Sequence, residues 1–476
     1  MRRRTTHKKR RAREEAPPPE RALRLRVGAI GAKGDGVCAP ISGDDGEPAE
    51  AGRDVYVAYT APGDVIDAQV AGDRGRMTAL VAPGPDRAPP PCPHYGVCGG
   101  CALQHVTSSF YRRWKHDQVV DVLRVAGLDT DGLDDGGVAP LIEIDPASRR
   151  RAHFYVERFA VDAPGAEVSE VNAVKDSAVK DGAVKDSAGK DSAVRDGGVR
   201  LGFYERRSRR LVAVETCVIL HPALSARLEA LAALAAAAPA GWPRFALAVT
   251  LCDNGLDIDF AAKAPLGDPA PAEIERLASA MPAASAIRLC ANGAPLIARA
   301  APVVSFAGVA VTPPPGGFLQ ASIAGQDALI ALVAAAMKGA RRIVDLFSGC
   351  GAFTAPLARA ATLTAYDSDQ AAIAALKAGA AAARADGLKP VTAHRRDLFE
   401  RPLTPDELAP FDGAVIDPPR AGAIHQARLL AASTVPRVAY VSCNPKTFAR
   451  DAAILIDSGY RLKRVTPVDQ FAYSPH

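Results

Sequence analysis

Short apolar runs alternate with helix-like segments in the last third of the chain. The runs predict five strands, and the segments between them are rich in alanine. Strands that are apolar throughout and separated by helices are typical of a parallel sheet covered on both faces. Residues 321–476 are therefore predicted to form a doubly wound, Rossmann-like α/β domain. The predicted helix is 323–337, and the predicted strands are 342–347, 363–366, 391–394, 413–416 and 435–441.

The pattern near the N-terminus is that of a small all-β domain. Residues 55–59 and 64–70 have the alternation of strands and are joined by a turn at Pro62-Gly63, and residues 31–36 are rich in glycine. Short strands with glycine turns are typical of an OB-like barrel, which often binds nucleic acid. Residues 22–83 are therefore predicted to form such a barrel.

Residues 84–320 are predicted to form a central α+β domain. A proline-rich linker opens it, and residues 106–127 have the spacing of an amphipathic helix, which is expected to pack on the C-terminal domain. Residues 154–161 and 199–204 are predicted to be the two strands of a hairpin.

Two segments are predicted to lie outside the folded domains. Residues 1–21 are basic and then proline-rich, which is typical of a disordered tail. Residues 173–197 repeat a five-residue unit similar to Ala-Val-Lys-Asp-Ser. Because this period fits neither a helix face nor a strand face, the repeat predicts a flexible loop without a specific function.

The positive charge of the chain is concentrated in the tail. Residues 1–13 contain eight of the 58 lysines and arginines, so the remainder holds 50 basic against 53 acidic residues, although the whole chain carries a net charge of +5. A basic arm of this kind either contacts a polyanion such as RNA or stays solvated, and we weigh the two interpretations equally.

The remaining composition indicates a cytoplasmic protein without a membrane segment. A length of 476 residues with 48% hydrophobic content suits about three globular domains, and we expect a monomer. No apolar run is long enough to cross a membrane, and the first residues lack the apolar core of a signal peptide. Nine cysteines in a long chain favour metal binding or catalysis over a disulfide framework.

One cysteine occupies a position that favours catalysis. Cys443 follows the predicted strand 435–441, at the carboxyl end where parallel sheets bind their ligands. Free cysteines are often only buried packing residues, but the surrounding Ser442-Cys-Asn-Pro445 favours a nucleophile. A nucleophilic thiolate needs a lowered pKa, and Arg420 is the candidate for the neighbouring cation.

The first predicted strand of the C-terminal domain ends in a glycine-rich loop at residues 345–351. Its glycines let the backbone approach a ligand, but neither a Gly-x-Gly-x-x-Gly motif nor a Walker lysine is present. Asp367 ends the next strand, where a carboxylate can bind ribose hydroxyls, and Asp397 follows the third strand, in reach of an adenine amine. An adenosine-shaped site without phosphate ligands predicts S-adenosylmethionine as the cofactor.

The fourth predicted strand ends at Asp417-Pro-Pro-Arg420. Two prolines would stop any strand, and this alone could explain them. In the functional interpretation, Asp417 and Arg420 face the target base in the crevice above the sheet.

Three motifs together resemble the RNA (uracil-5-)-methyltransferase family. They lie at residues 345–351, 417–422 and 442–445, and a fourth, at 317–320, is similar except that Ser322 stands where the family has asparagine. The N-terminal barrel resembles a TRAM domain through Gly34-Asp-Gly36 and Pro62-Gly-Asp64. With the cysteine-rich loop described below, it matches the subgroup that acts on 23S ribosomal RNA.

The resemblance implies S-adenosylmethionine-dependent methylation of carbon 5 of a uridine, in 23S rRNA or, as an alternative, in tRNA. Cys443 would add to carbon 6 of a flipped uracil, so that carbon 5 becomes nucleophilic. Cytosine-5 enzymes acting on RNA tend to carry a cysteine at the place of Pro419-Arg420, which favours uracil. The implied cofactor-binding residues are Gln320, Asp345, Phe347, Gly349, Gly351, Asp367, Asp397 and Asp417.

Three cysteines, Cys92, Cys98 and Cys101, share one short loop. They could bind zinc if His94 or His105 were the fourth ligand. The resemblance instead implies a [4Fe-4S] cluster of structural role, in which Cys217 is the fourth thiolate. The cysteines predicted to be core residues are Cys38, Cys252, Cys290 and Cys350.

In the family, a glutamate of a His-x-Glu motif near the C-terminus removes the proton from carbon 5. This sequence runs to the corresponding histidine, His476, so the glutamate and a final strand are expected beyond it. We consider, in order, a truncated sequence, an impaired enzyme that traps RNA through Cys443 and releases it slowly, and an RNA-binding protein without catalysis. The strand near Arg461–Val465 is expected to lack a neighbour.

Overall fold

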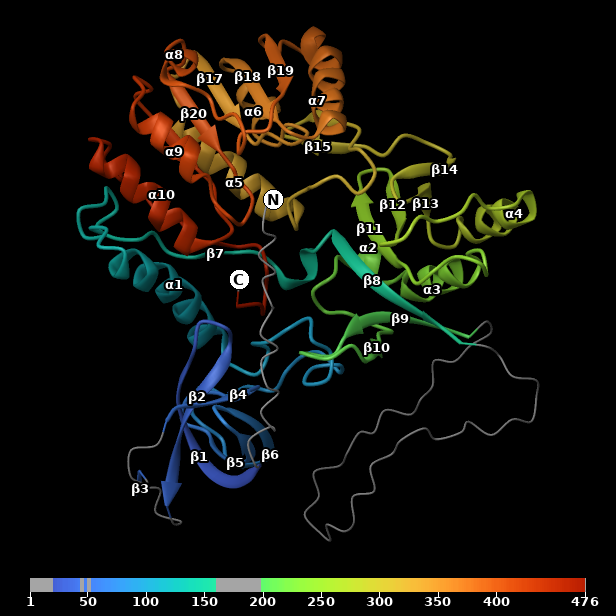
Figure 1. Ribbon diagram of the computed structural model, residues 1–476, viewed down its shortest axis with the longest axis vertical. Helices are drawn as coiled ribbons and strands as arrows, with labels where there is room; N and C mark the ends of the chain where they lie inside the picture. Colours follow the sequence, from blue (N-terminus) through green and yellow to red (C-terminus); the bar gives the residue numbers. More distant parts are fainter. Residues whose placement is uncertain (1–19, 43–46, 49–52, 160–197, 476) are drawn as a thin grey trace, which may run out of the picture. The chain divides into compact units, whose positions relative to one another are not determined.

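The computed structural model describes residues 20–42, 47–48, 53–159 and 198–475 (Figure 1). Nearly all of the predicted tail, and the whole five-residue repeat, lie outside the described residues. Contacts divide the chain into two compact units. One consists of Met1–Pro90, Ala102–Tyr111 and Pro475, and the other of Pro91–Cys101, Arg112–Ser474 and His476. Among the described helices, none is long and apolar enough to cross a membrane.

The first unit is the predicted small barrel. Its sheet has the strand order β1-β5-β6-β4-β2-β3, and an additional pairing of β1 with β2 closes it. In β5 every second residue is buried, and these residues meet Leu25 and Val57 in a core between the strands. The strands are β1 Arg21–Ile30, β2 Asp35–Ser42, β3 Glu47–Pro48, β4 Val55–Ala58, β5 Val65–Ala71 and β6 Arg74–Ala82.

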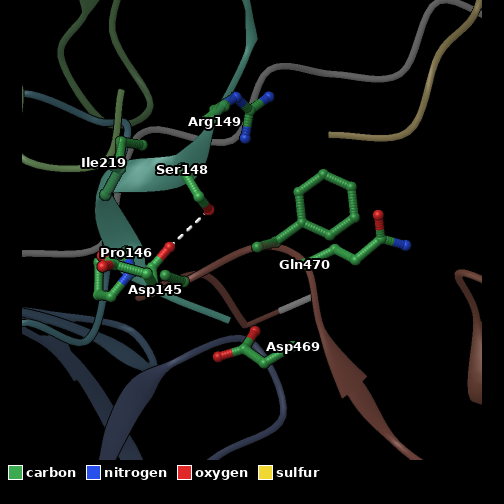
Figure 2. A pocket seen from close by; sticks show the side chains of 9 residues that line it. Asp145, Pro146, Ser148, Arg149, Ile219, Asp469 and Gln470 are labelled. Carbon is green, nitrogen blue, oxygen red and sulfur yellow. Dashed lines mark hydrogen bonds between the residues drawn. The ribbon is translucent and has the colours of Figure 1, made fainter. Parts of the chain in front are cut away.

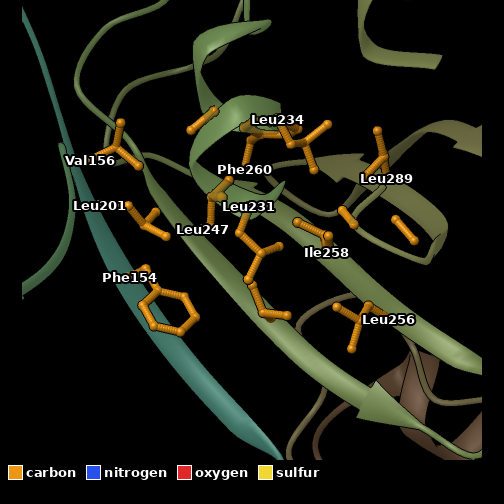
Figure 3. Close-up of a cluster of buried hydrophobic side chains, with 14 of the residues drawn as sticks. Phe154, Val156, Leu201, Leu231, Leu234, Leu247, Leu256, Ile258, Phe260 and Leu289 are labelled. Atoms are coloured by element: carbon orange, nitrogen blue, oxygen red, sulfur yellow. The ribbon is translucent and has the colours of Figure 1, made fainter. Parts of the chain in front are cut away.

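A seven-stranded mixed sheet forms the first half of the second unit, in the order β10-β9-β8-β11-β12-β13-β14. Helices α3 and α4 cover one of its faces with a large apolar cluster, part of which is drawn in Figure 3. The strands are β8 Arg151–Arg158, β9 Val199–Tyr204, β10 Leu211–Ala213, β11 Ala246–Cys252, β12 Gly255–Ala261, β13 Ala286–Ala291 and β14 Ala294–Ala298. The helices are α2 Pro222–Ser225, α3 Leu228–Ala236 and α4 Pro271–Ala280.

Five parallel strands form the other large sheet, in the order β19-β18-β17-β20-β21. Neighbouring residues of β17 belong to different apolar clusters, because Ile343 packs with α5 and α7 and Val344 packs with α8, α9 and α10. Both faces are therefore covered, as the apolar strands predict. The strands are β17 Arg342–Leu346, β18 Thr362–Asp367, β19 Val391–Arg395, β20 Gly413–Ile416 and β21 Val438–Tyr440.

The last strand of this sheet is shorter than predicted, since it begins at Val438 and not at Val435. Pro436 has no amide hydrogen to donate to a neighbouring strand, which explains the later start. The helices are α5 Ile323–Ala336, α6 Thr354–Leu357, α7 Gln370–Ala382, α8 Pro405–Leu408, α9 Ile424–Ala431 and α10 Pro445–Asp457, and β15 Val304–Phe306 pairs with β16 Val309–Val311 ahead of them.

The predicted helix at 106–127 is present as α1 Ser108–Val125, and its Leu123 packs against Ala449 and Ala452 of α10. Lys115 of α1 forms a buried ion pair with Asp469, with 3.0 Å between Nζ and Oδ1. This pair anchors the last residues of the chain, where β22 Val468–Asp469 runs parallel to β7 Ile142–Glu143.

The prediction of an unpartnered strand near Arg461–Val465 is wrong. Residues 461–467 form no strand, and several of their carbonyl groups accept hydrogen bonds. Lys463 O accepts a hydrogen bond from Asp134 N at 2.8 Å, and Val465 O accepts one from Ala139 N at 2.9 Å. The segment before β7 thus pairs with these backbone groups in place of a neighbouring strand.

Candidate active site at the carboxyl edge of the parallel sheet

Cys443 lies just beyond the carboxyl end of β21 and directly before α10. Asn444 caps this helix, with its side chain accepting a hydrogen bond from Lys446 N. The Cys443 side chain is exposed. Desolvation by the surrounding residues nevertheless raises the pKa of the Cys443 thiol, and the charge of Asp417 raises this pKa further. The charge of Arg420 lowers it, but the net shift is upward.

The net direction of this pKa shift contradicts the prediction of a lowered thiol pKa. Arg420 acts in the predicted sense, but desolvation and the carboxylate of Asp417 outweigh it. The three predicted catalytic residues are nevertheless brought together, since both charges act on the same thiol. Asp417 and Arg420 come from the loop after β20, and Cys443 comes from the loop after the neighbouring β21.

A buried carboxylate, Asp451 of α10, joins these two loops. Its Oδ2 accepts hydrogen bonds from Ala423 N and from the Tyr440 hydroxyl, both at 2.7 Å. Asn444 Nδ2 adds a bond of 3.2 Å to Arg420 O. The loop that carries Arg420 and the loop that carries Cys443 are therefore held as one unit. Nothing in the sequence pattern marked Asp451, because an acidic residue within a helix is usually solvated.

Gln320 connects the loop after β20 to Gln470, which directly follows β22. Its Nε2 donates to Asp417 Oδ2 at 3.2 Å, and its Oε1 accepts from Gln470 Nε2 at the same distance. Burial raises the pKa of Asp417 to about 7, while the bond from Gln320 lowers it. A carboxyl group with this pKa exchanges its proton near neutral pH.

Arg150 holds the backbone of Gln320 in place. Its side chain is almost fully buried, its Nε donates to Gln320 O at 3.1 Å, and its Nη2 donates to Gln326 Oε1 at 2.6 Å. Neither Arg150 nor Gln470 was predicted from the sequence to belong to the site. The signal for Arg150 was a run of three arginines at the start of a core strand.

The predicted cofactor loop follows β17 and has three residues with positive φ. These are Phe347 at 63°, Gly349 at 54° and Gly351 at 94°. A Cβ on Gly351 would lie 2.4 Å from Leu376 Cδ1, so the loop packs closely on α7 there. A Cβ on Gly349 would meet no atom within 4 Å, so the backbone there is open to a ligand.

Asp345 lies beneath this loop and is fully buried. Thr354 Oγ1 donates to its Oδ2 at 2.5 Å, whereas Oδ1 is buried and has no hydrogen-bond partner among the described residues. Burial is the main reason that its pKa rises to about 7, and the charges of Asp417 and Asp367 raise it further. An unused buried acceptor is costly unless a ligand donates to it, so this oxygen fits a cofactor donor.

The two other predicted acids lie at the ends of β18 and β19. Asp367 accepts from Gly349 N through Oδ2 and from Asp369 N through Oδ1, each at 2.8 Å, so it also shapes the cofactor loop. Asp397 accepts from Phe399 N at 2.9 Å. The ring of Phe399 is 43% exposed and lies 5.4 Å from the Phe347 ring, which leaves an aromatic surface at this edge.

A small pocket opens beside Gln470 (Figure 2). It lies between the segment leading into β8 and the segment following β22, and the guanidinium of Arg149 stands 5.6 Å from the ring of Phe471. Its lining is formed by Asp145, Pro146, Ser148, Arg149, Ile219, Asp469, Gln470, Phe471 and Ala472.

The four cysteines predicted to bind a cluster are half-buried, and two of them, Cys101 and Cys217, lie near Arg149. Burial and the neighbouring thiols of Cys217 and Cys92 raise the pKa of Cys98, and Cys101 and Cys217 both interact with the Arg149 guanidinium. Within the part of the chain that the structure describes, however, no group of three or more His, Cys, Asp or Glu side chains could hold a metal ion. Neither the predicted [4Fe-4S] cluster nor the zinc alternative is therefore supported, because nearness alone does not form a ligand set.

The remaining cysteines are packing residues, as predicted. Cys38, Cys252, Cys290 and Cys350 are all buried. Burial raises the pKa of Cys350, in the cofactor loop, to about 11, which keeps this thiol protonated at neutral pH.

Comparison with known proteins shows which families and sequences this chain resembles. The profile of the tRNA (Uracil-5-)-methyltransferase family matches residues 316–476. An uncharacterized RNA methyltransferase of Caulobacter vibrioides is 41% identical over 457 residues, which cover 95% of this chain and 97% of the relative. The 23S rRNA (uracil(1939)-C(5))-methyltransferase RlmD of Chromohalobacter salexigens is 30% identical, covering 89% of this chain and 83% of its own.

A solved structure shares the fold over nearly the whole chain. It is the tRNA (uracil-54, C5)-methyltransferase of Pyrococcus abyssi in complex with S-adenosyl-L-homocysteine, with a TM-score of 0.64 and 19% identity, covering 95% of this chain and 98% of the other. The sequence relatives establish the family as well as the fold, because they match most of this chain with at least 30% identity. The chain belongs to the RNA (uracil-5-)-methyltransferase family.

Proposed function

We propose that this chain methylates carbon 5 of a uridine in RNA, with S-adenosylmethionine as the methyl donor and Cys443 as the nucleophile. The observation that carries the proposal is the meeting of Cys443, Asp417 and Arg420 at the carboxyl edge of the parallel sheet, where both charges act on the thiol. A lone buried cysteine would have no need of such partners.

The chemistry requires covalent help because carbon 5 of uracil is a poor nucleophile. The Cys443 thiol loses its proton and its sulfur bonds to carbon 6, which converts the ring to an enolate. Carbon 5 would then take the methyl group as the bond between this group and the sulfonium sulfur of the donor breaks, which leaves S-adenosyl-L-homocysteine. A base removes the proton from carbon 5, and the bond between carbon 6 and the Cys443 sulfur breaks to restore the thiolate. The target base must leave its stack, since the thiolate attacks the ring face.

The residues around Cys443 fit these steps. Arg420 lowers the pKa of the thiol and so favours the attacking form. Asp417, with a pKa of about 7, is partly protonated at neutral pH and can donate a hydrogen bond to a uracil carbonyl as the enolate forms. Gln320 fixes the orientation of Asp417 from one side.

The residues that would hold the methyl donor lie at the neighbouring strand ends. When bound, S-adenosylmethionine supplies the methyl group. Asp345 Oδ1 is a buried acceptor available to an amino group, and the open backbone at Gly349 admits the ligand chain. The carboxylate of Asp367 is suited to ribose hydroxyls, and the carboxylate of Asp397 and the rings of Phe347 and Phe399 are suited to the adenine.

The proposed RNA is 23S ribosomal RNA, with tRNA as the second candidate. The relative named as a 23S rRNA enzyme shares 30% identity over most of this chain, whereas the structure of the tRNA enzyme shares 19%. The test is incubation of the purified protein with labelled S-adenosylmethionine and total RNA from a strain that lacks the gene. Nuclease mapping should place 5-methyluridine at one position in 23S rRNA, and a label confined to tRNA would select the alternative.

The same assay distinguishes an enzyme from an RNA-binding protein without catalysis. Binding without any 5-methyluridine in either RNA would overturn the proposed activity. No step of the proposal involves a metal at Cys92, Cys98, Cys101 and Cys217, and iron and acid-labile sulfide analysis of anaerobically purified protein tests the predicted cluster directly.

A further inference from the structure

Asp451 is a fully buried carboxylate in the second turn of α10, and both of its oxygens accept hydrogen bonds. Its Oδ2 accepts from Ala423 N and from the Tyr440 hydroxyl, and its Oδ1 accepts from Arg450 Nε at 2.8 Å. Burying a charge is costly unless such bonds offset the loss of water. Tyr440 belongs to β21 and Ala423 to the loop after β20, so one carboxylate bonds the strand that precedes Cys443 to the neighbouring loop.

The loop after β20 is bonded to one face of α10 at more than this point. Asn444 Nδ2 and Thr447 Oγ1 both donate to Arg420 O, at 3.2 Å and 3.4 Å. Asp451 accepts from Ala423 N, three residues further along the loop. Because positions 444, 447 and 451 are three and four residues apart, their side chains lie on the same side of the helix. The backbone from Arg420 to Ala423 therefore follows the first two turns of α10.

The same loop packs on α10 too closely for a side chain at Gly422. Its φ is 75°, and a Cβ there would lie 2.7 Å from Asp451 Oδ2 and 2.9 Å from Thr447 Cβ. Glycine meets both requirements. Arg450 Nη2 adds a hydrogen bond of 3.1 Å to Ala421 O. The loop thus has one well-defined position against the helix while these contacts persist.

Two charged side chains act on the Cys443 thiol in opposite directions. The charge of Asp417 raises the pKa of the thiol, and the charge of Arg420 lowers it. Asp417 directly follows β20 and is bonded by Gln320, whereas Arg420 is carried by the loop that Asp451 holds. A Coulomb interaction weakens with distance, so a loop that moved away from α10 would remove the favourable charge and leave the unfavourable one.

We propose that Asp451 is a positioning residue that keeps the guanidinium of Arg420 beside the Cys443 thiol. Because the Asp451 side chain is fully buried, it acts through Arg420 and not by contact with RNA. It does so by bonding the end of β21 and the loop after β20 to α10 at once. The proposal deepens the proposed function and rests on it, since it takes Cys443 as the nucleophile.

The test is the rate at which iodoacetamide alkylates Cys443 in the full chain, without RNA or S-adenosylmethionine, over a range of pH that spans the ionisation of the thiol. Only the thiolate reacts, so the midpoint of the profile reports the pKa of Cys443. Trypsin releases Cys443 as the single cysteine of residues 438–446, so mass spectrometry distinguishes it from the other cysteines.

Asp451→Asn should raise this midpoint by about one pH unit and slow alkylation below the midpoint about tenfold, since one nearby opposite charge lowers a pKa by at least about that much. The sign of the shift is informative. Loss of a carboxylate would by itself lower the pKa of a nearby thiol, so a rise reports the displacement of Arg420 and not the lost charge of Asp451.

Two further variants separate this effect from a loss of stability. Tyr440→Phe removes only the bond from β21 and should raise the midpoint by a smaller amount, so the proposal stays testable if Asp451→Asn does not fold. The matched control is Asp257→Asn in the mixed sheet, because Asp257 is also a buried carboxylate and is bonded by Arg288 at 2.7 Å through each oxygen. This control should lose stability and leave the midpoint unchanged.

Arg420→Ala completes a double-mutant cycle with Asp451→Asn. Alone, Arg420→Ala should raise the midpoint at least as much as Asp451→Asn does. Adding Asp451→Asn to Arg420→Ala should raise it no further, because Asp451 acts through Arg420. A rise that persists in the Arg420→Ala background would overturn the proposal, and so would an unchanged midpoint in folded Asp451→Asn and Tyr440→Phe.

Methylation of total RNA by the same variants separates this proposal from the proposed function. A protein that methylates RNA, but whose thiol midpoint is the same with and without Asp451→Asn, would overturn the positioning role alone. The expected midpoint shifts in a protein that methylates no RNA would support the positioning of Arg420 and refute the activity.

Discussion

The two large sheets of this protein differ in where their polar and exposed side chains lie. In the parallel sheet both faces are covered, and the candidate catalytic residues Asp417 and Cys443 lie beyond the strand ends. In the mixed sheet one face is covered by α3 and α4, and exposed residues such as Tyr155 lie along the other. The number of covered faces therefore decides whether the exposed side chains of a sheet lie at its edge or along one of its faces.

The largest effect is expected from Cys443→Ser at the edge of the parallel sheet. Serine is a far weaker nucleophile than cysteine, so methyl transfer should fall at least ~10⁴-fold while the melting temperature barely changes. Cys290→Ser in the mixed sheet is the matched control, since Cys290 is fully buried in β13. That variant should lose about 1–3 kcal/mol of stability and keep its activity per folded molecule. Activity of Cys443→Ser within tenfold of the parent would refute the nucleophile.

The next largest effect is a difference in the free energy of unfolding between substitutions at adjacent residues of β8, because their side chains lie on opposite faces of the sheet. Phe154→Ala removes a fully buried ring that packs 5.2 Å from Phe203, and should lower the free energy of unfolding by about 3–5 kcal/mol. Tyr155→Ala should lower it by less than about 1 kcal/mol. Guanidinium denaturation measures both, and equal losses would mean that the second face is also part of a core.

The pH dependence of stability probes the edge of the parallel sheet. Because the pKa of Asp417 rises to about 7 on folding, the folded protein keeps a proton that the unfolded chain releases above pH ~4. Stability should therefore fall as the pH rises from about 4 to 7, and Asp417→Asn should reduce this fall by up to about 1.4 kcal/mol per pH unit. Denaturation midpoints at several pH values measure the slope.

Asp412→Asn is a control for this slope, because the pKa of Asp412 shifts on folding in the direction opposite to that of Asp417. Burial alone would raise the pKa of Asp412, but hydrogen bonds from Arg341 N and Arg342 N lower it overall. The ionised Asp412 carboxylate stabilises the fold above the pKa that this group has in the unfolded chain, and the stabilisation disappears as the pH falls through its pKa in the folded protein. Asp412→Asn should therefore change stability only on the acid side of the pH range. An unchanged slope between pH 4 and 7 in Asp417→Asn would contradict the buried proton.

The smallest effect is expected at Gln470, whose side chain acts on the site through its hydrogen bond to Gln320. Gln470→Ala should lower methyl transfer about tenfold or less, since Gln320 loses one restraint. Gln470→Glu can accept but not donate, so it should rotate the Gln320 amide, turn its oxygen toward Asp417 and shift the pH profile of the reaction upward. Gln426→Glu is the control, because the Gln426 side chain, which is more deeply buried than that of Gln470, bonds to the backbone of Leu403 and not to Gln320. A pH profile that Gln470→Glu leaves unchanged would show that Gln470 does not position Asp417.

Sequence alone determined the local features of this protein. Apolar runs separated by alanine-rich helices were enough to predict the parallel strands, and short motifs placed Cys443, Asp417 and the cofactor loop at their ends, because each depends on neighbouring residues. Tertiary structure decided what depends on distant residues. Burial and the Asp417 charge reversed the expected pKa shift of Cys443, and Arg150 and Gln470 reached Gln320 across 170 and 150 positions of sequence. Desolvation and long-range hydrogen bonds leave no periodic trace in a sequence, so only the folded chain reveals them.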